Sequence, residues 1–138
     1  MIDRAKLDQM LSNLEGCLGV LRSMARVPRA EFLANPDKVG NAKYHFVVAI
    51  ECCIDIANHV IASQRFRLPR DNADCFVILV ENGLVPERLR EPLRGMARFR
   101  NRLVHVYWDI DDAAVHDYRQ QSLHHIEDLA RAVASAAC

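Results

Sequence analysis

Apolar residues recur at intervals of three and four along most of this chain. Residues 2–24 carry them at Leu7, Met10, Leu11, Leu14, Cys17, Leu18 and Leu21. This spacing predicts an amphipathic helix with one buried face. The following stretch, RVPRAEFLANP (26–36), breaks the pattern with two prolines and leaves room for a short helical turn at 31–33.

A longer helix is predicted over residues 37–63, where Pro36 can occupy the first position. Its apolar residues lie on more than one side, so we expect it to be the central and most buried helix. A polar stripe runs along it, made of Glu51, Asp55, Asn58 and His59. Buried polar groups need partners, so the stripe is either satisfied by its surroundings or part of a site.

The rest of the chain repeats the same helical periodicity in shorter segments separated by turn residues. The predicted elements are a helix at 72–81 stopped by Gly83, a helix at 87–106 opened by Pro86, and a helix at 113–136 capped by Asp111 or Asp112. We therefore predict one all-α domain over residues 1–138, an antiparallel bundle of four long helices plus one short helix.

Charge and cysteine content narrow the classes of protein to which this chain can belong. The 138 residues contain 18 Lys and Arg against 18 Asp and Glu, a balance that argues against wrapping long duplex nucleic acid. Five cysteines without a C-x-x-C pair fit reduced thiols in a cytoplasm better than a disulfide framework. The start of the chain is charged from its third residue, and no apolar run reaches about 18 residues, so neither a signal peptide nor a membrane span is expected.

The helix predicted at 87–106 carries two stripes. Leu89, Leu93, Met96, Leu103 and Val106 form a core face, and Arg94, Arg98, Asn101 and His105 form a polar ridge beside it. A guanidinium can hold a phosphate and compensate charge on it, and an imidazole can move a proton near neutral pH. Together they suffice for RNA cleavage without a metal. The alternative from spacing alone is a solvated ridge whose His interacts with the helix dipole.

At this ridge the chain resembles the HEPN superfamily, and within it the HepT-like branch. The superfamily marker is Arg, four to six residues, then His, which Arg100 and His105 match with four between. Arg98 also fits, with six between, although the Arg100–Asn101 pair favours Arg100. Tyr107 completes the HepT-like form, Arg-x4-His-x-Tyr. AIECCIDIANHVIA (49–62) and FVILVENGLV (76–85) look like the family's long second helix and its middle helix, so the likeness covers about residues 42–111.

The resemblance implies a homodimer in which the Arg/His motifs face a shared cleft. It implies a metal-independent endoribonuclease, without cofactor, that acts as the toxin of a type VII-like toxin–antitoxin pair. The implied partner is a small nucleotidyltransferase antitoxin that silences the toxin by adding AMP to Tyr107. The implied catalytic pair is Arg100 and His105, with Asn101, Arg98 and Asp55 in support.

Several alternatives stay open. Residues five apart lie about 140° apart on a straight helix, so Arg100 and His105 do not share a face. Either the long Arg side chain reaches round, the helix loosens before Trp108, or each His works with the Arg of the other subunit. We favour the last, helped by the first. A non-catalytic module that binds its nucleotidyltransferase partner or nucleotides is the second reading of function, and a plain dimerisation protein is the third.

Overall fold

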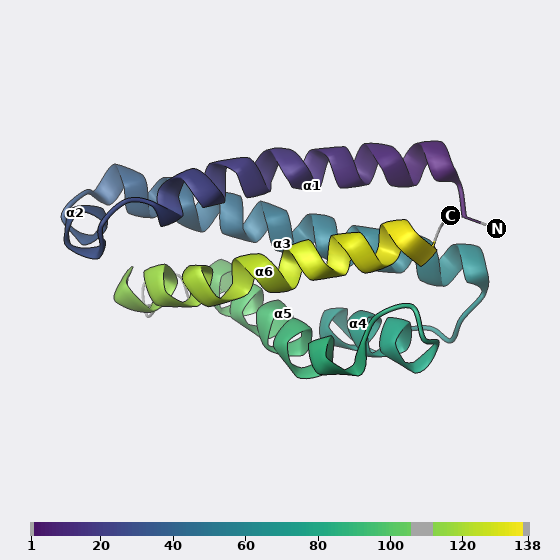
Figure 1. Ribbon diagram of the computed structural model, residues 1–138. Helices are drawn as coiled ribbons and strands as arrows, with labels where there is room; N and C mark the ends of the chain where they lie inside the picture. The colour runs from purple at the N-terminus through teal and green to yellow at the C-terminus, as the bar shows by residue number, and fades with distance from the viewer. Residues whose placement is uncertain (1, 106–111, 137–138) are drawn as a thin grey trace.

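The computed structural model describes residues 2–105 and 112–136, and every element in those ranges is helical (Figure 1). The elements are α1 (Arg4–Ala25), α2 (Arg29–Leu33), α3 (Pro36–Gln64), α4 (Asn72–Glu81), a 3₁₀ turn η1 (Glu87–Leu89), α5 (Arg90–His105) and α6 (Asp112–Ala136). The predicted all-α fold is confirmed. The homodimer stays a prediction.

Local signals set the ends of these helices. The carboxylate of Asp3 accepts the backbone N–H of Lys6 at the start of α1, and Asp71 caps α4 in the same way through the N–H of Asp74. Asn35 caps α3, whose first residue is Pro36, as predicted. Gly83 has a φ of +75°, a conformation that glycine adopts without strain, so it stops α4 where expected.

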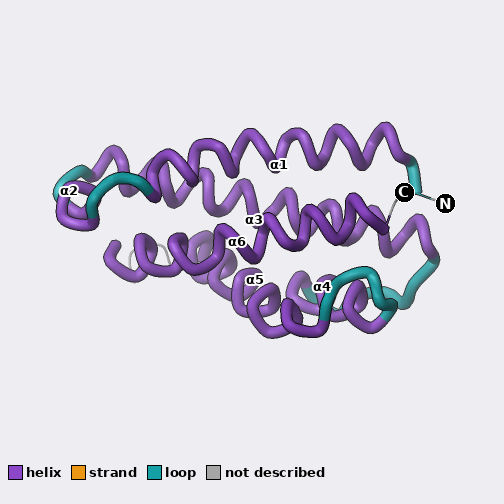
Figure 2. Tube along the Cα trace, in the orientation of Figure 1, coloured by secondary structure: helices purple, strands orange, loops and turns teal. Residues whose placement is uncertain are grey.

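Helix α3 is the centre of the fold, as its apolar pattern predicts. It packs against α1, α4, α5 and α6, and Figure 2 shows the loops gathered at the two ends of the helices. By length and composition alone α3 could also cross a membrane, but half of its most apolar stretch is buried inside the protein. Packing against the surrounding helices therefore accounts for the buried half of that stretch.

An aromatic cluster joins three helices beneath the ridge of α5. Phe46 of α3 is fully buried and meets the rings of Phe99 and Tyr118 edge-on, at centroid distances of 5.6 and 5.8 Å. Phe99 of α5 and Tyr118 of α6 stack on each other at 4.2 Å. Such pairs add directional preference to hydrophobic burial, so they fix how α5 is rotated against α3 and α6.

The start of the predicted fourth helix was wrong by three residues. A continuous α-helix from Glu87 would need the N–H of Pro92 to bond the carbonyl of Arg88, but proline has no N–H and its ring clashes there. The chain instead forms the turn η1, and α5 begins at Arg90. Its predicted core face is buried at Leu89, Leu93, Met96 and Leu103, whereas Val106 lies outside the described residues.

The final helix begins at Asp112, one residue earlier than expected, so Asp112 belongs to α6 itself. Asp111, the other expected cap, lies outside the described residues. Asp112 pairs with Lys43 of α3, whose ammonium lies 3.1 Å from its carboxylate. The side chain of Lys43 is only 9% exposed, so a buried cation from the central helix holds the first turn of α6.

Candidate active site at the end of helix α5

Arg100 lies where α5 packs on α3, and its guanidinium is held from two directions. Its Nη2 donates to a carboxylate oxygen of Glu51 at 2.6 Å, and its Nη1 donates to the side-chain oxygen of Asn101 at 3.1 Å. The side chain of Arg100 is 18% exposed and that of Glu51 is 46% exposed. Because one side of the pair is shielded from water, the contact restricts the guanidinium more than a surface pair would.

The polar stripe of α3 forms the wall of a small pocket beside Arg100. The pocket has a volume of about 240 Å³ and is lined by Arg100, Glu51, Ile54, Asp55, Asn58 and Asn72. Three of the four stripe residues thus reach this pocket, and Glu51 makes the direct contact. The fourth, His59, does not line it, and its buried Nε2 makes no hydrogen bond with the described residues.

Asn72 was missed by the sequence reading. It is the first residue of α4 and enters the pocket only because α4 folds back against α3. In the sequence, Asn72 lies at the predicted start of a helix. A polar residue is common there, so its presence suggests no further role. No periodicity along one helix shows which residue of another helix will meet it.

His105 is the last residue of α5 and is exposed to solvent. Asn101 precedes it by four residues, so the two lie about 40° apart on one flank of the helix. The hydrogen bond from Arg100 to Asn101 thus links the guanidinium to a side chain of the flank that carries His105.

Arg98 lies on the other side of α5 from Arg100. It is exposed, and it lines a groove of about 300 Å³ between the start of α4 and α5, which we call the α4–α5 groove. Its charged lining residues are Arg70, Asp71, Asp74, Arg90, Arg94 and Arg98. The structure does not bring Arg98 into the Arg100 pocket. Tyr107, the predicted modification site, lies outside the described residues.

Comparison with known proteins identifies the family. The model of the family described as "Ribonuclease HepT-like" matches residues 14–133. The chain belongs to the HepT-like family. It is 38% identical over 80 residues to the mRNA nuclease HepT of Shewanella oneidensis, a match that spans 57% of the length of each protein.

Solved structures share the fold of this HepT-like chain at lower identity. The cytosolic protein of unknown function YutE from Bacillus subtilis superposes with a TM-score of 0.86 and 21% identity, covering 98% of this chain and 90% of that one. A tri-AMPylated Shewanella oneidensis HEPN toxin, solved in complex with an MNT antitoxin, gives 0.86 and 23%, covering 98% and 99%. A toxin–antitoxin structure with AMP-PNP gives 0.86 and 22%, covering 94% and 97%.

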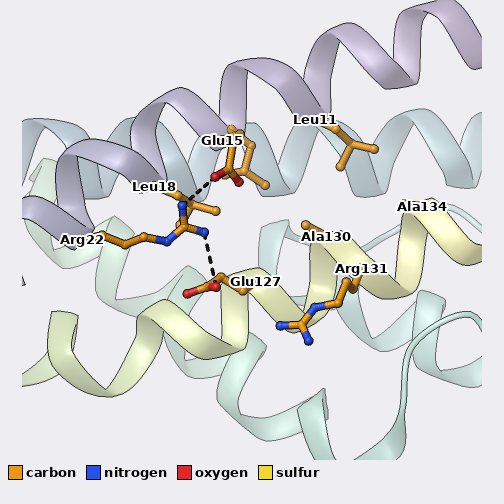
Figure 3. A pocket seen from close by; sticks show the side chains of 9 residues that line it. Leu11, Glu15, Leu18, Arg22, Glu127, Ala130, Arg131 and Ala134 are labelled. Carbon is orange, nitrogen blue, oxygen red and sulfur yellow. Dashed lines mark hydrogen bonds and ion pairs between the residues drawn. The ribbon is translucent and has the colours of Figure 1, made fainter.

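A second groove of the HepT-like chain shows how its arginines behave when they only hold helices together. Figure 3 shows Arg22 of α1 placed between Glu15 of the same helix and Glu127 of α6, at 2.6 and 3.3 Å. The rest of this α1–α6 groove is lined by Arg131 and by apolar residues that include Leu11 and Ala130. The hydrogen bond to Glu15 raises the pKa of Arg22. Its charge is thus matched twice, as expected for an interhelical clamp.

Other titratable groups of the described residues do not converge on a metal-binding cluster of three or more His, Cys, Asp or Glu side chains. His124 and His125 of α6 have their rings 4.0 Å apart, and burial together with the charge of His124 lowers the pKa of His125. The four described cysteines are free thiols. Burial raises the pKa of Cys75 to about 12, which keeps it protonated and unreactive at neutral pH.

Proposed function

We propose that this HepT-like protein is a metal-independent endoribonuclease and the toxin of a type VII-like toxin–antitoxin pair. The observation that carries the proposal is the oriented guanidinium of Arg100 next to the flank that bears the exposed His105. The relative of known name is an mRNA nuclease, and similar structures are toxins bound to antitoxins, which supports the same reading.

The proposed reaction uses the RNA itself as the nucleophile. The 2′-oxygen attacks the adjacent phosphorus, the bond from phosphorus to the 5′-oxygen breaks, and a 2′,3′-cyclic phosphate remains. A base must take the 2′-hydroxyl proton, and an acid must give a proton to the departing 5′-oxygen. Arg100 compensates the charge that builds on the phosphorane oxygens, and His105 performs one of the two proton transfers.

One histidine moves one proton at a time, so a second donor or acceptor is needed. We propose that a homodimer supplies it, because a two-fold interface presents the same patch of α5 twice to a single cleft. The exposure of His105 at the helix end is compatible with this arrangement. Asn101 and Asp55 are proposed as supporting residues, since Asn101 bonds Arg100 and Asp55 lines the same pocket.

Tyr107 is the proposed site of silencing by a small nucleotidyltransferase antitoxin that transfers AMP. It follows His105 by two residues, so covalent AMP would carry its phosphate into the surroundings of the catalytic pair. The tri-AMPylated toxin among the similar structures supports this proposal.

A non-catalytic module that binds a nucleotidyltransferase or nucleotides is the second candidate. The observation that favours it is the 2.6 Å contact between Arg100 and Glu51, because a guanidinium already paired with a carboxylate must exchange or share that partner to bind a phosphate. Under this reading the cleft binds without cleaving.

The deciding experiment is cleavage of single-stranded RNA by the purified protein in excess EDTA. We expect cleavage by the parent protein and a loss of about 100-fold or more in His105→Ala, the range typical of a lost general acid or base. Arg131→Ala, at a 75% exposed side chain on α6, is the control. Equal circular dichroism and unfolding midpoints show that the variants fold. Absence of cleavage by the parent protein favours the binding module. Full activity of His105→Ala overturns the catalytic role of His105.

A further inference from the structure

The α4–α5 groove has a charge distribution unlike that of the α1–α6 groove. Four arginines line it from two elements, Arg70 before α4 and Arg90, Arg94 and Arg98 along α5. The side chains of Arg70 and Arg98 make no ion pair or hydrogen bond with the residues that the structure describes. The guanidinium groups of Arg70, from the loop before α4, and of Arg98, from α5, can therefore both bind an anion in this groove.

The other two arginines have partners that are easily replaced. Arg90 pairs with Glu87 at 2.8 Å, and Arg94 pairs with Glu91 at 2.6 Å. Both carboxylates are mostly exposed, at 73% and 66%, and each pair lies within one turn of chain. Exposed pairs of this kind contribute only about 0.2–1 kcal/mol, so a phosphate that takes two guanidinium hydrogen bonds competes with them well.

The two aspartates of the groove are already committed to other groups. Asp71 accepts the N–H of Asp74 at 2.8 Å as the cap of α4. Asp74 accepts two hydrogen bonds from Arg67, at 2.7 and 2.9 Å, and one from the backbone N–H of Arg70. These contacts, with Arg67 as the main cause, lower the pKa of Asp74 to about 2. Arg67 thus neutralises the carboxylate that would otherwise repel an anion here.

The α5 arginines of this groove form an evenly spaced row along the helix. Residues four apart rise about 6 Å along a helix, so Arg90, Arg94 and Arg98 present evenly spaced cations along one flank. The same flank continues through Asn101 to His105, which is about 10 Å further along the axis than Arg98. The row therefore leads from the groove to the proposed cleavage site.

We propose that the α4–α5 groove binds the sugar–phosphate backbone of single-stranded RNA on one side of the scissile bond. The inference rests on the proposed nuclease function of His105, and it assigns Arg70, Arg94 and Arg98 to substrate binding. A neutral chain thereby gains a local polyanion site, because the acidic residues that balance its net charge lie elsewhere or are already paired.

The test measures binding of a fluorescent single-stranded RNA to protein carrying His105→Ala, so that cleavage does not interfere. In this background we compare Arg70→Gln/Arg94→Gln with the matched control Arg4→Gln/Arg131→Gln, which removes two exposed arginines paired within their own helices. Loss of two phosphate contacts should weaken binding about 10-fold or more. It should also reduce the slope of log K against log salt by about 1.4, since each single-strand contact contributes about 0.7. The control double variant should bind as its parent does.

A groove variant with unchanged affinity and salt slope overturns the inference. If the protein with His105 intact cleaves RNA and the groove variant keeps its KM, the groove inference fails while the nuclease proposal stands. If the protein binds RNA through the groove but does not cleave it, the nuclease proposal fails while the groove stands. Should the double variant fold poorly, Arg70→Gln alone decides, because Arg70 lies in a loop and its side chain makes no ion pair or hydrogen bond with a described residue.

Discussion

The two flanks of α5 use the same residue type for different purposes. On the flank facing α3, Arg100 is largely buried and is held by Glu51 at 2.6 Å. On the flank facing the start of α4, Arg98 is exposed and lines a groove with three further arginines. The first arrangement fixes the position of one cation. The second gathers four cations, of which only Arg90 and Arg94 have carboxylate partners, both within the same turn of chain.

The two arrangements give a criterion for distinguishing a catalytic arginine from a binding arginine within one chain. Transition-state stabilisation requires a group that is oriented before the reaction begins. Binding a flexible polyanion requires summed charge, and it tolerates mobile side chains. On the basis of burial and a short contact from another helix, we propose Arg100 as the catalytic arginine, whereas Arg98 has the surroundings of a binding residue.

The largest effect on activity should come from replacing Arg100 and Arg98 by alanine in separate variants. We expect Arg100→Ala to lower kcat for RNA cleavage by about 100-fold or more, as is typical when one oriented charge-stabilising donor is removed. Arg98→Ala should instead raise KM several-fold and leave kcat within about two-fold. Single-turnover kinetics at saturating RNA separate the two parameters. The reverse result would make Arg98 the working arginine and end the distinction drawn here.

A smaller effect is expected from the carboxylate that orients Arg100. Glu51→Gln keeps the size of the side chain but removes its charge, so the guanidinium is held less firmly. We expect kcat to fall about 10-fold with little change in KM, and a double-mutant cycle with Arg100→Ala should show strong coupling. Asp8→Asn, which removes an exposed carboxylate from α1, serves as the control. Additive effects of the two substitutions would mean that Glu51 does not act through Arg100.

The smallest effect concerns acid stability beside the α4–α5 groove. The pKa of Asp74 lies at about 2, below its ordinary value of 3.8, because Arg67 bonds the charged form. Stability from this contact is complete above about pH 4 and is lost as the pH falls through about 2. Asp74→Asn should therefore unfold at a urea concentration that changes less between pH 5 and pH 2 than that of the parent. An equal change in both proteins would show that Asp74 is not committed to Arg67.

Much of the fold follows from local sequence. The helix at 72–81 was predicted with its observed boundaries. Gly83 marks its end in the sequence, and the structure shows that Asp71 caps its start. The start of α5 was missed because Pro92 acts four residues earlier in the chain. It has no N–H to donate to the carbonyl of Arg88, so the α-helix begins only at Arg90. The buried Lys43 was not anticipated either, since its partner Asp112 comes from a helix 69 positions away in sequence.

The site was predictable to the extent that each helix could be read by itself. Periodicity grouped Glu51 with Asp55, and motif spacing selected Arg100 and His105. What periodicity cannot show is which faces meet, so the Glu51–Arg100 contact was one option among several. Arg70 was missed because it lies in a connecting loop, and only the folding of α4 against α5 gives it neighbours of like charge.

Phe99 has a consequence beyond its packing. It stands between Arg98 and Arg100 in sequence, and its stacking on Tyr118 fixes the direction in which it points. Each arginine is offset from it by about 100°, in opposite senses, so the two are directed apart by a single aromatic ring. Inserting one residue just before Phe99 would rotate the preceding arginine row away from the groove while His105 kept its place. The packing of Phe99 in the protein interior thus fixes the direction of the arginine row relative to that of His105.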